Sequence, residues 1–333
     1  MPDSIESLVR DLTSDDRAVR TAAQDALVAL GPVAVEHVLP LLDDRRASGG
    51  DSEGIAFFRR ASHSTVPHLQ EIRRRGPGSL RRPALRALLE VGGEDGLDSR
   101  DRQVIERLVR IKLLSEKQDR VTLPRETRWL AFPADELEGA VGALGLHDLR
   151  PATSVMGVAA TTVAKDSIET EAPDGRRVDA FRVFITPEFK GWRLVYGDSF
   201  LDAVGGPELA EKISERCGEG HFYNIDTYHN ANVWWIARKG RVVRGHSTYA
   251  DSEWVGDPLP FELTYIEADA DDPFLDPDLV ERYSEGVTDP DMVALKLSVE
   301  PGRMRPAAMR GHGWLATTHP AVPNRLFQGA LPI

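Results

Sequence analysis

Apolar side chains recur at the three- and four-residue spacing of amphipathic helices through the first third of the chain. This spacing predicts helices over residues 5–12, 19–31, 33–42, 80–92 and 100–114. We therefore expect Ile5 to Leu114 to form an antiparallel stack of helices that contains no strand.

Two of these helices share a sequence pattern. Val19–Gly31 and Leu80–Gly92 match at an arginine, at an Ala-Leu pair and at the terminal glycine. Small residues let a neighbouring helix approach closely, and the glycine suits a left-handed helix cap. The second copy contains Pro83, which a helix tolerates in its first turn, so this helix is expected to begin near Arg82.

The first copy carries residues that resemble the second-helix signature of the HEAT repeat family, namely Asp15-Asp16, Val19-Arg20, Ala26-Leu27 and Gly31. The resemblance covers roughly residues 5–114. It implies paired helices in which an aspartate and an arginine tie adjacent turns together, and a surface that binds other molecules. The two copies lie 61 residues apart, from 19 to 80, which exceeds one repeat of about 40 to 47 residues. The second repeat is therefore degenerate, and residues 47–54 are predicted to be an inserted loop. A stack that only buttresses the next domain is the alternative.

The pattern changes after residue 128, where period-two alternation replaces helical spacing. Strands are predicted over residues 154–163, 179–186 and 192–197, and helices over residues 135–144 and 207–217. The fold class predicted is an α-helical, HEAT-like repeat region at residues 1–118, followed by an α+β domain with a mainly antiparallel sheet at residues 119–333.

A hairpin is predicted over Asn232–Tyr249, folded at Lys239-Gly240. A two-residue turn pairs Trp235 with Arg244, which suggests a cation–π contact, and it lets the ring of Trp234 cover a glycine.

The segment Gly191-Trp-Arg-Leu-Val-Tyr-Gly197, with the tract Met292–Trp314, resembles a group of uncharacterised bacterial proteins that share a Gly-Trp-x-Leu-Val-x-Gly core. This resemblance implies a domain and no particular chemistry.

Charge is distributed unevenly along the chain. The formal net charge is −12, and residues 1–120 hold 20 acidic and 20 basic side chains, so the whole excess lies after residue 120. Between Tyr249 and Asp291 there are 14 acidic residues and one basic residue, Arg282. Such a surface repels phosphates, so we expect no nucleic-acid partner for this half. The basic run Phe58–Lys112 is expected to be a solvated helix face or a dock for the acidic half.

Composition also limits the cellular setting. No apolar run reaches the roughly 18 to 20 residues of a membrane span, and the N-terminal sequence lacks a secretory pattern. The single cysteine, Cys217, suits a reducing compartment, and its place in a predicted helix suggests an inert core thiol. We therefore expect a cytoplasmic protein without a membrane partner.

Catalytic and metal-binding motifs are weak. His221, Asp226 and His229 lack the helical spacing of zinc sites, and nothing indicates that they activate Cys217. The aspartates near residue 270 lack the glycine and terminal glutamate of a calcium loop. We expect no catalytic residue, metal or cofactor, and we expect a chelator to leave thermal stability unchanged.

These features favour a non-enzymatic binding protein with a basic protein partner, one form of which is an immunity-type protein that masks a toxin or nuclease. The predicted partner-binding residues combine acids with aromatic anchors: Trp254, Phe261, Asp269, Asp271, Asp272, Phe274, Asp276 and Asp278. The alternative is an enzyme of unrecognised family whose pocket lies between the Trp192 strand and the hairpin, lined by Trp192, His229, Trp235 and Arg244.

Overall fold

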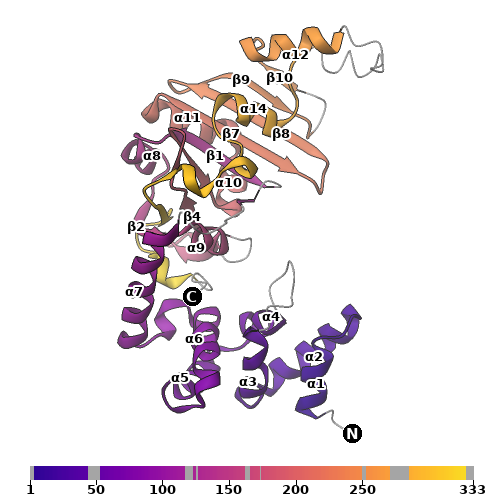
Figure 1. Cartoon of the computed structure of the whole chain (residues 1–333), viewed down its shortest axis with the longest axis vertical. Helices are drawn as coiled ribbons and strands as arrows, with labels where there is room; N and C mark the ends of the chain where they lie inside the picture. Colours follow the sequence, from indigo (N-terminus) through magenta and orange to yellow (C-terminus); the bar gives the residue numbers. More distant parts are fainter. Residues whose placement is uncertain are drawn as a thin grey trace. The chain divides into compact units, whose positions relative to one another are not determined.

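The computed structural model describes residues 4–43, 53–116, 123–124, 127–161, 166–172, 174–249, 253–270 and 285–327. The chain divides into two compact units, Met1–Arg110 with Arg325–Ile333, and Ile111–Asn324 (Figure 1). The division falls inside helix α7 (Ser99–Ser115), whereas the sequence pattern suggested residue 118.

The first unit is built from helices, and no strand occurs among residues 4–43 and 53–116. This agrees with the helical part of the sequence prediction. The α-helices before α7 are α1 (Ile5–Asp11), α2 (Arg17–Leu30), α3 (Pro32–Val38), α4 (Glu53–Arg60), α5 (Val66–Arg75) and α6 (Gly78–Gly92). Short 3-10 turns follow α3, precede α5 and follow α6, at Leu39–Asp43, His63–Thr65 and Gly93–Gly96.

Local sequence explains where the first helices begin and end. The Asp16 carboxylate accepts a 2.8 Å hydrogen bond from the backbone N–H of Ala18 at the start of α2. The helix ends at Gly31, whose φ of 60° places it in the left-handed region. Apolar residues of successive helices then form one core, which includes Leu27, Val38, Phe58, Leu69 and Leu88.

Helix α6 differs from its prediction in two ways. It begins at Gly78 rather than near Arg82, so Pro83 lies inside it and cannot donate a backbone hydrogen bond to the preceding turn. Pro83 is buried, and its packing together with the apolar face of α6 offsets that missing bond. The left-handed residue is Gly93, with φ 55°, one position after the predicted Gly92.

The second unit is an α+β fold whose strands pair antiparallel throughout the described residues. The main path runs β10-β9-β8-β7-β1-β6-β4-β12-β2. Its strands are β1 (Arg128–Pro133), β2 (His147–Ala152), β4 (Arg177–Ile185), β6 (Trp192–Tyr196), β7 (Glu219–Asp226), β8 (Ala231–Arg238), β9 (Arg241–Ser247), β10 (Glu253–Val255) and β12 (Gly313–Thr317). Three short strands pair at its margins: β3 (Ser167–Glu171), β5 (Glu188–Phe189) and β11 (Met309–Arg310).

Helices cover both faces of this sheet. Leu130, Phe222 and Trp235 point to one face, where they pack with residues of α8 (Leu137–Ala143), α10 (Asp198–Val204) and α11 (Gly206–Cys217). The alternate residues point to the other face, which α9 (Ser154–Ala160) and α14 (Pro290–Leu297) contact. Helix α12 (Pro260–Ala270) follows β10.

One predicted strand, residues 154–163, is wrong, because this segment contains α9. Its start is fixed by Thr153, whose hydroxyl accepts a 3.2 Å hydrogen bond from the N–H of Met156. Gly157 faces the ring of Phe184 so closely that a Cβ atom there would lie 2.1 Å from it. The β-branched residues of the segment suggested a strand, but capping and close helix–sheet packing decide the structure.

The predicted hairpin forms, but its register is wrong beyond the turn. Trp235 pairs with Gly245, and Arg244 pairs with Ile236. The register shifts between Ile236 and Ala237, which leaves Val243 as an extra residue in β9, a β-bulge. The bulge places Arg244 and Trp235 on opposite faces of the sheet, so the predicted contact between them does not form.

Candidate functional site

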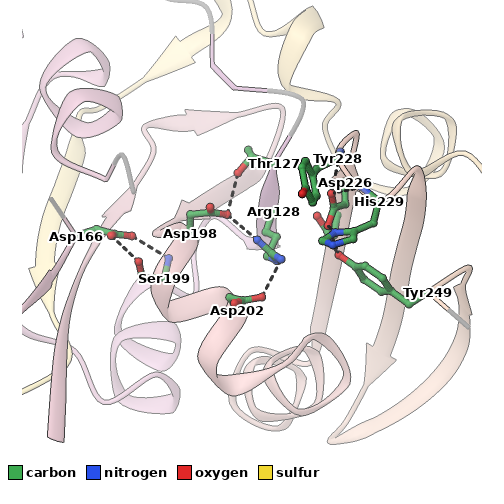
Figure 2. A network of polar contacts seen from close by, with 11 residues as sticks. Thr127, Arg128, Asp166, Asp198, Ser199, Asp202, Asp226, Tyr228, His229 and Tyr249 are labelled. Atoms are coloured by element: carbon green, nitrogen blue, oxygen red, sulfur yellow. Dashed lines mark hydrogen bonds and ion pairs between the residues drawn. The ribbon is translucent and has the colours of Figure 1, made fainter. Parts of the chain in front are cut away.

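The loop between β7 and β8 is organised by Asp226 (Figure 2). One oxygen of its carboxylate, Oδ1, accepts hydrogen bonds from the backbone N–H groups of Tyr228 and His229, each 3.0 Å long. Aspartate commonly stabilises turns in this way. Asn230 completes the loop at φ 51°, in the left-handed region that asparagine tolerates.

The second oxygen of Asp226, Oδ2, binds two side chains. Nδ1 of His229 lies 2.8 Å away, and the hydroxyl of Tyr249 donates a 2.8 Å hydrogen bond. The amide of Asn224 donates in turn to the Tyr249 oxygen, at 2.8 Å. Burial acts to raise the pKa of Asp226, but the hydrogen bonds from His229 and Tyr249 together outweigh it and hold that pKa well below its usual range. The carboxylate is therefore ionised.

Three rings surround this carboxylate and face solvent. Tyr228 is 90% exposed and Tyr249 is 48% exposed. The ring of His229 makes edge contacts with both, at centroid distances of 4.8 Å to Tyr228 and 6.2 Å to Tyr249. We call Asp226, Tyr228, His229 and Tyr249 the Asp226 cluster. Its hydrogen bonds orient the rings without covering them.

A second set of charges lies beside this cluster. Arg128, at the start of β1, is the direct partner of Asn224 in β7, so the two side chains share a face of the sheet. Its guanidinium contacts Asp198 at 3.1 Å and Asp202 at 2.8 Å, as Figure 2 shows. The pKa of Tyr249 is raised, chiefly by burial and also by Asp226, and the nearby charge of Arg128 acts in the opposite direction.

Asp198 and Asp202, which contact Arg128, both belong to α10. The start of this helix is held by Asp166. Asp166 is fully buried, and its carboxylate accepts hydrogen bonds from the Ser199 N–H at 2.9 Å and from the Ser199 hydroxyl at 2.7 Å. Burial raises the pKa of Asp166. This pair holds the helix that presents Asp198 and Asp202, so its role is structural.

The predicted partner-binding residues lie in several settings. Trp254, in β10, packs against the ring of His246, with centroids 4.0 Å apart, and its ring centroid lies 4.4 Å from Cζ of Arg244. Phe261 is half-buried in the first turn of α12, and the backbone of Asp269 lies near the end of the same helix. The other five lie outside the described residues: Asp271, Asp272, Phe274, Asp276 and Asp278.

The four residues predicted to line a pocket have separate surroundings. Trp235 is buried in the core on the α11 face, whereas Arg244 lies on the opposite face. His229 belongs to the exposed Asp226 cluster. Trp192 packs against the ring of His221, with centroids 4.8 Å apart. The bulge in β9 accounts for the separation of Trp235 from Arg244.

Arg244 forms a buried ion pair in place of the predicted contact with Trp235. Two of its nitrogens lie 3.1 Å from the two carboxylate oxygens of Glu262, and a third donates to the Gly256 carbonyl at 2.6 Å. Glu262 also accepts from the backbone N–H of Leu259 at 2.7 Å and of Val287 at 3.1 Å. Through these hydrogen bonds, the ion pair joins the start of α12 to strand β9 of the sheet.

His221 and His229, which the sequence pattern raised as weak metal or catalytic candidates, do not lie in one site. His221 is fully buried on the face opposite Asp226, because the two positions in β7 differ by an odd number of residues. Cys217 is buried at the end of α11, as predicted, and burial, assisted by the charge of Glu136, raises its pKa to about 11. A thiol of this kind is a poor nucleophile.

Among the described residues, no three His, Cys, Asp or Glu side chains gather in a way that could hold a metal ion. None of the helices in those ranges has the length and apolarity that crossing a membrane requires. Comparison of the chain with protein-family models, with curated proteins and with solved structures finds no match in any of the three.

Sequence reasoning missed most of the Asp226 cluster. Asp226 and His229 were noted for possible metal or thiol chemistry, and the contribution of Tyr249 went unseen. A signal did exist, because an aspartate at the end of a strand commonly accepts hydrogen bonds from the backbone N–H groups that follow it. Nothing local links that turn to Arg128 or to α10, since strand pairing alone brings them together.

Proposed function

We propose that the C-terminal unit is a non-enzymatic binding module for a basic protein partner, and that the Asp226 cluster is its anchor. The observation that carries the proposal is that one ionised carboxylate holds the exposed rings of His229 and Tyr249, and that the exposed ring of Tyr228 packs edge-on against His229. Rings fixed before binding lose little conformational freedom when a partner covers them. Exposed tyrosines of this kind also supply a large contact area with a polar end.

Charge supports a basic partner. Residues 121–333 hold 33 acidic and 21 basic side chains, which accounts for the full net charge of −12. Asp202, whose side chain is 66% exposed, adds a negative charge next to the cluster. A field of this sign speeds the encounter with a basic surface and disfavours nucleic acid.

The acidic stretch from Tyr249 to Asp291 contributes to the same field in this proposal. Tyr249, its first residue, belongs to the cluster. Trp254 is engaged with Arg244 and His246 inside the unit, so Tyr228 and Tyr249 replace it as the proposed anchors. The concrete form we favour is a cytoplasmic, immunity-type protein that masks the basic active site of a toxin such as a nuclease.

For the N-terminal unit we propose a HEAT-like scaffold. The matched arginines of its two related helices make equivalent contacts. Arg20 donates to the carbonyl oxygens of Ser14 and Asp15, at 2.7 and 2.9 Å, just before α2. Arg81 donates to the carbonyl of Gly76 at 2.9 Å, just before α6. Equal roles at matched positions are what a duplicated helical unit would produce.

The binding proposal is tested by affinity capture from cells that naturally contain the protein, with the full chain as bait. We expect a basic protein to be recovered by the wild-type chain and lost from the double variant Tyr228→Ala/Tyr249→Ala. The matched control is Glu138→Lys, at an exposed acid of α8 outside the cluster, which should retain the partner. Capture of the same protein by the double variant, or capture of no basic protein at all, contradicts the proposal.

A further inference from the structure

A cavity of about 470 Å³ lies between the β5–β6 turn and the segment that follows α14. Its apolar wall includes Phe189, Leu295, Val299 and Met304. Phe189 and Val299 are buried and form a small core with Met309, against which Trp192 and Met304 pack. A cavity of this size suits a small organic molecule.

Cations surround this cavity. Lys190, Arg303 and Arg305 line it, and a single carboxylate, Glu300, accompanies them. Glu300 is buried, with 5% of its surface exposed. One of its carboxylate oxygens accepts a 2.7 Å hydrogen bond from the N–H of Gly302. The other oxygen lies 3.6 Å from Arg303. Within the described ranges, no carboxylate lies within ion-pair distance of Lys190 or Arg305. In a chain with a net charge of −12, this is a local excess of positive charge.

The turn between β5 and β6 fixes the position of one cation. Phe189 pairs directly with Trp192, so Lys190 and Gly191 form a two-residue turn. Both turn residues have positive φ, 50° and 83°, which is the backbone conformation of the tight turns that best match the twist of paired strands. The backbone of Lys190 is thereby held at the rim of the cavity.

A buried polar chain leads to the cavity wall. The hydroxyl of Ser298, which lines the cavity, lies 3.1 Å from the hydroxyl of Tyr223. The Tyr223 hydroxyl lies 3.1 Å from Nδ1 of His221, and Nε2 of His221 lies 3.2 Å from the Glu219 carboxylate. His221 and Tyr223 are fully buried, and burial lowers the pKa of His221 and raises that of Tyr223. A neutral histidine and a neutral tyrosine therefore hold the Ser298 oxygen in one place.

We propose that this cavity binds a small organic anion with an apolar body and one carboxylate or phosphate group. The apolar body contacts Phe189, Val299 and Met304. The anionic group lies against Lys190 and Arg305. The site is separate from the Asp226 cluster, and none of its residues takes part in the protein binding proposed above.

The test uses 8-anilinonaphthalene-1-sulfonate, an aromatic anion whose fluorescence rises in apolar surroundings, with the full chain. The double variant Lys190→Gln/Arg305→Gln is expected to bind it at least tenfold more weakly. The matched control Arg176→Gln/Arg177→Gln removes two exposed cations of the same unit and should bind like the wild type. Equal affinity for the two double variants overturns the proposal, because the dye would then report apolar surface alone.

Two further variants locate the bound anion. Ala308→Trp places a large ring in the cavity from an exposed lining position and should abolish dye binding while all cations remain. Ser298→Ala should leave binding within about twofold, because the Ser298 hydroxyl donates its hydrogen to Tyr223 rather than to the anion. Undiminished binding to Ala308→Trp places the dye elsewhere and also overturns the proposal. Displacement of the dye by octanoate or by phenyl phosphate tells which anionic group the site prefers, whereas displacement by inorganic phosphate alone contradicts a requirement for the apolar body.

Discussion

At the scale of single residues, Asp226 matters because four donors converge on one carboxylate. Two backbone N–H groups fix the loop, while His229 and Tyr249 fix the rings. An aspartate at the end of a strand is a local signal for such a turn, but we did not predict this turn from the sequence. The bond to Tyr249 could not be predicted, because it spans 23 residues and depends on how β7, β8 and β9 pair.

The first prediction concerns Asp226→Asn and pH. The native pKa of Asp226 lies below its unfolded value of about 3.9, so the ionised carboxylate stabilises the fold above about pH 4, and this contribution is lost as pH falls toward the native pKa. We expect Asp226→Asn to lower the free energy of unfolding by about 1 to 2 kcal/mol at pH 7. The difference from wild type should shrink near pH 3.

Urea unfolding followed by tryptophan fluorescence measures this difference. All six tryptophans lie between residues 129 and 314, so the signal reports on the second unit. The control Glu138→Gln, at an exposed acid, should leave the unfolding curves unchanged at each pH. A stability difference that stays constant from pH 7 to pH 3 would show that the ionised form of Asp226 has no special role.

The second prediction concerns the buried pair of Arg244 and Glu262. Glu262→Gln leaves a buried guanidinium without its counter-charge, and Arg244→Met leaves a buried carboxylate, so each should cost about 3 to 5 kcal/mol. The double variant Arg244→Met/Glu262→Met leaves no unpaired charge in the interior. It should cost much less than the sum of the two single changes. Additive losses in urea unfolding would mean that the two residues act independently.

At the scale of elements, the sequence pattern predicted α1, α2, α3, α6 and α7 in the first unit, but not α4 and α5. In the second unit it predicted the strands β4, β6, β8 and β9. Helical spacing, capping residues and glycine stops are local signals, which is why α2, α7 and α11 lie close to their predicted bounds. The errors arise where tertiary packing decides. Helix α9 depends on its Thr153 cap and on the fit of Gly157 against Phe184, and no local signal marks the second contact.

The hairpin shows the same limit. The Lys239-Gly240 turn was predicted correctly, and Ala237 pairs with Val242 as a two-residue turn requires. The bulge at Val243 then shifts the register by one residue and reverses which side chains share a face. The sequence offers no mark of the bulge, because its benefit comes from burying Arg244 against Glu262, which lies in a distant helix.

The third prediction uses two glycines to test this packing. A Cβ atom on Gly245 would lie 2.0 Å from the Trp235 ring, so Gly245→Ala forces the ring or the strand to move and should cost about 2 to 3 kcal/mol. Gly142, in α8, has no atom within 4 Å of an added Cβ. Gly142→Ala should therefore be neutral or stabilise by up to about 1 kcal/mol. Equal effects of the two changes in urea unfolding would disprove the close contact at Gly245.

At the scale of the whole molecule, the ion pairs show which charges of the sequence are neutralised locally and which remain as net charge. The basic run of the first unit is neutralised locally: Arg73 contacts Asp101 at 2.8 Å, and Arg74 lies 3.6 Å from Asp98. These contacts join residues more than 20 positions apart, so a count along the sequence overstates the positive surface. The acidic excess of the second unit is larger than its local pairs can offset, and it leaves a net negative field.

The last prediction separates this field from the Asp226 cluster in the kinetics of binding the captured basic partner. Long-range attraction is screened within about 10 Å at 0.1 M salt, so association should slow at least tenfold between about 0.05 and 0.5 M salt. The variant Asp269→Lys/Asp271→Lys/Asp272→Lys should associate more slowly at low salt, with a weaker salt dependence and little change in dissociation. Tyr228→Ala should leave association within about twofold and speed dissociation at least tenfold, because contact residues act mainly after the encounter. Stopped-flow fluorescence measures both rates. If the triple variant unfolds, the acids contact the protein itself. If it remains folded and associates as fast as wild type at both salt concentrations, these acids do not steer the partner.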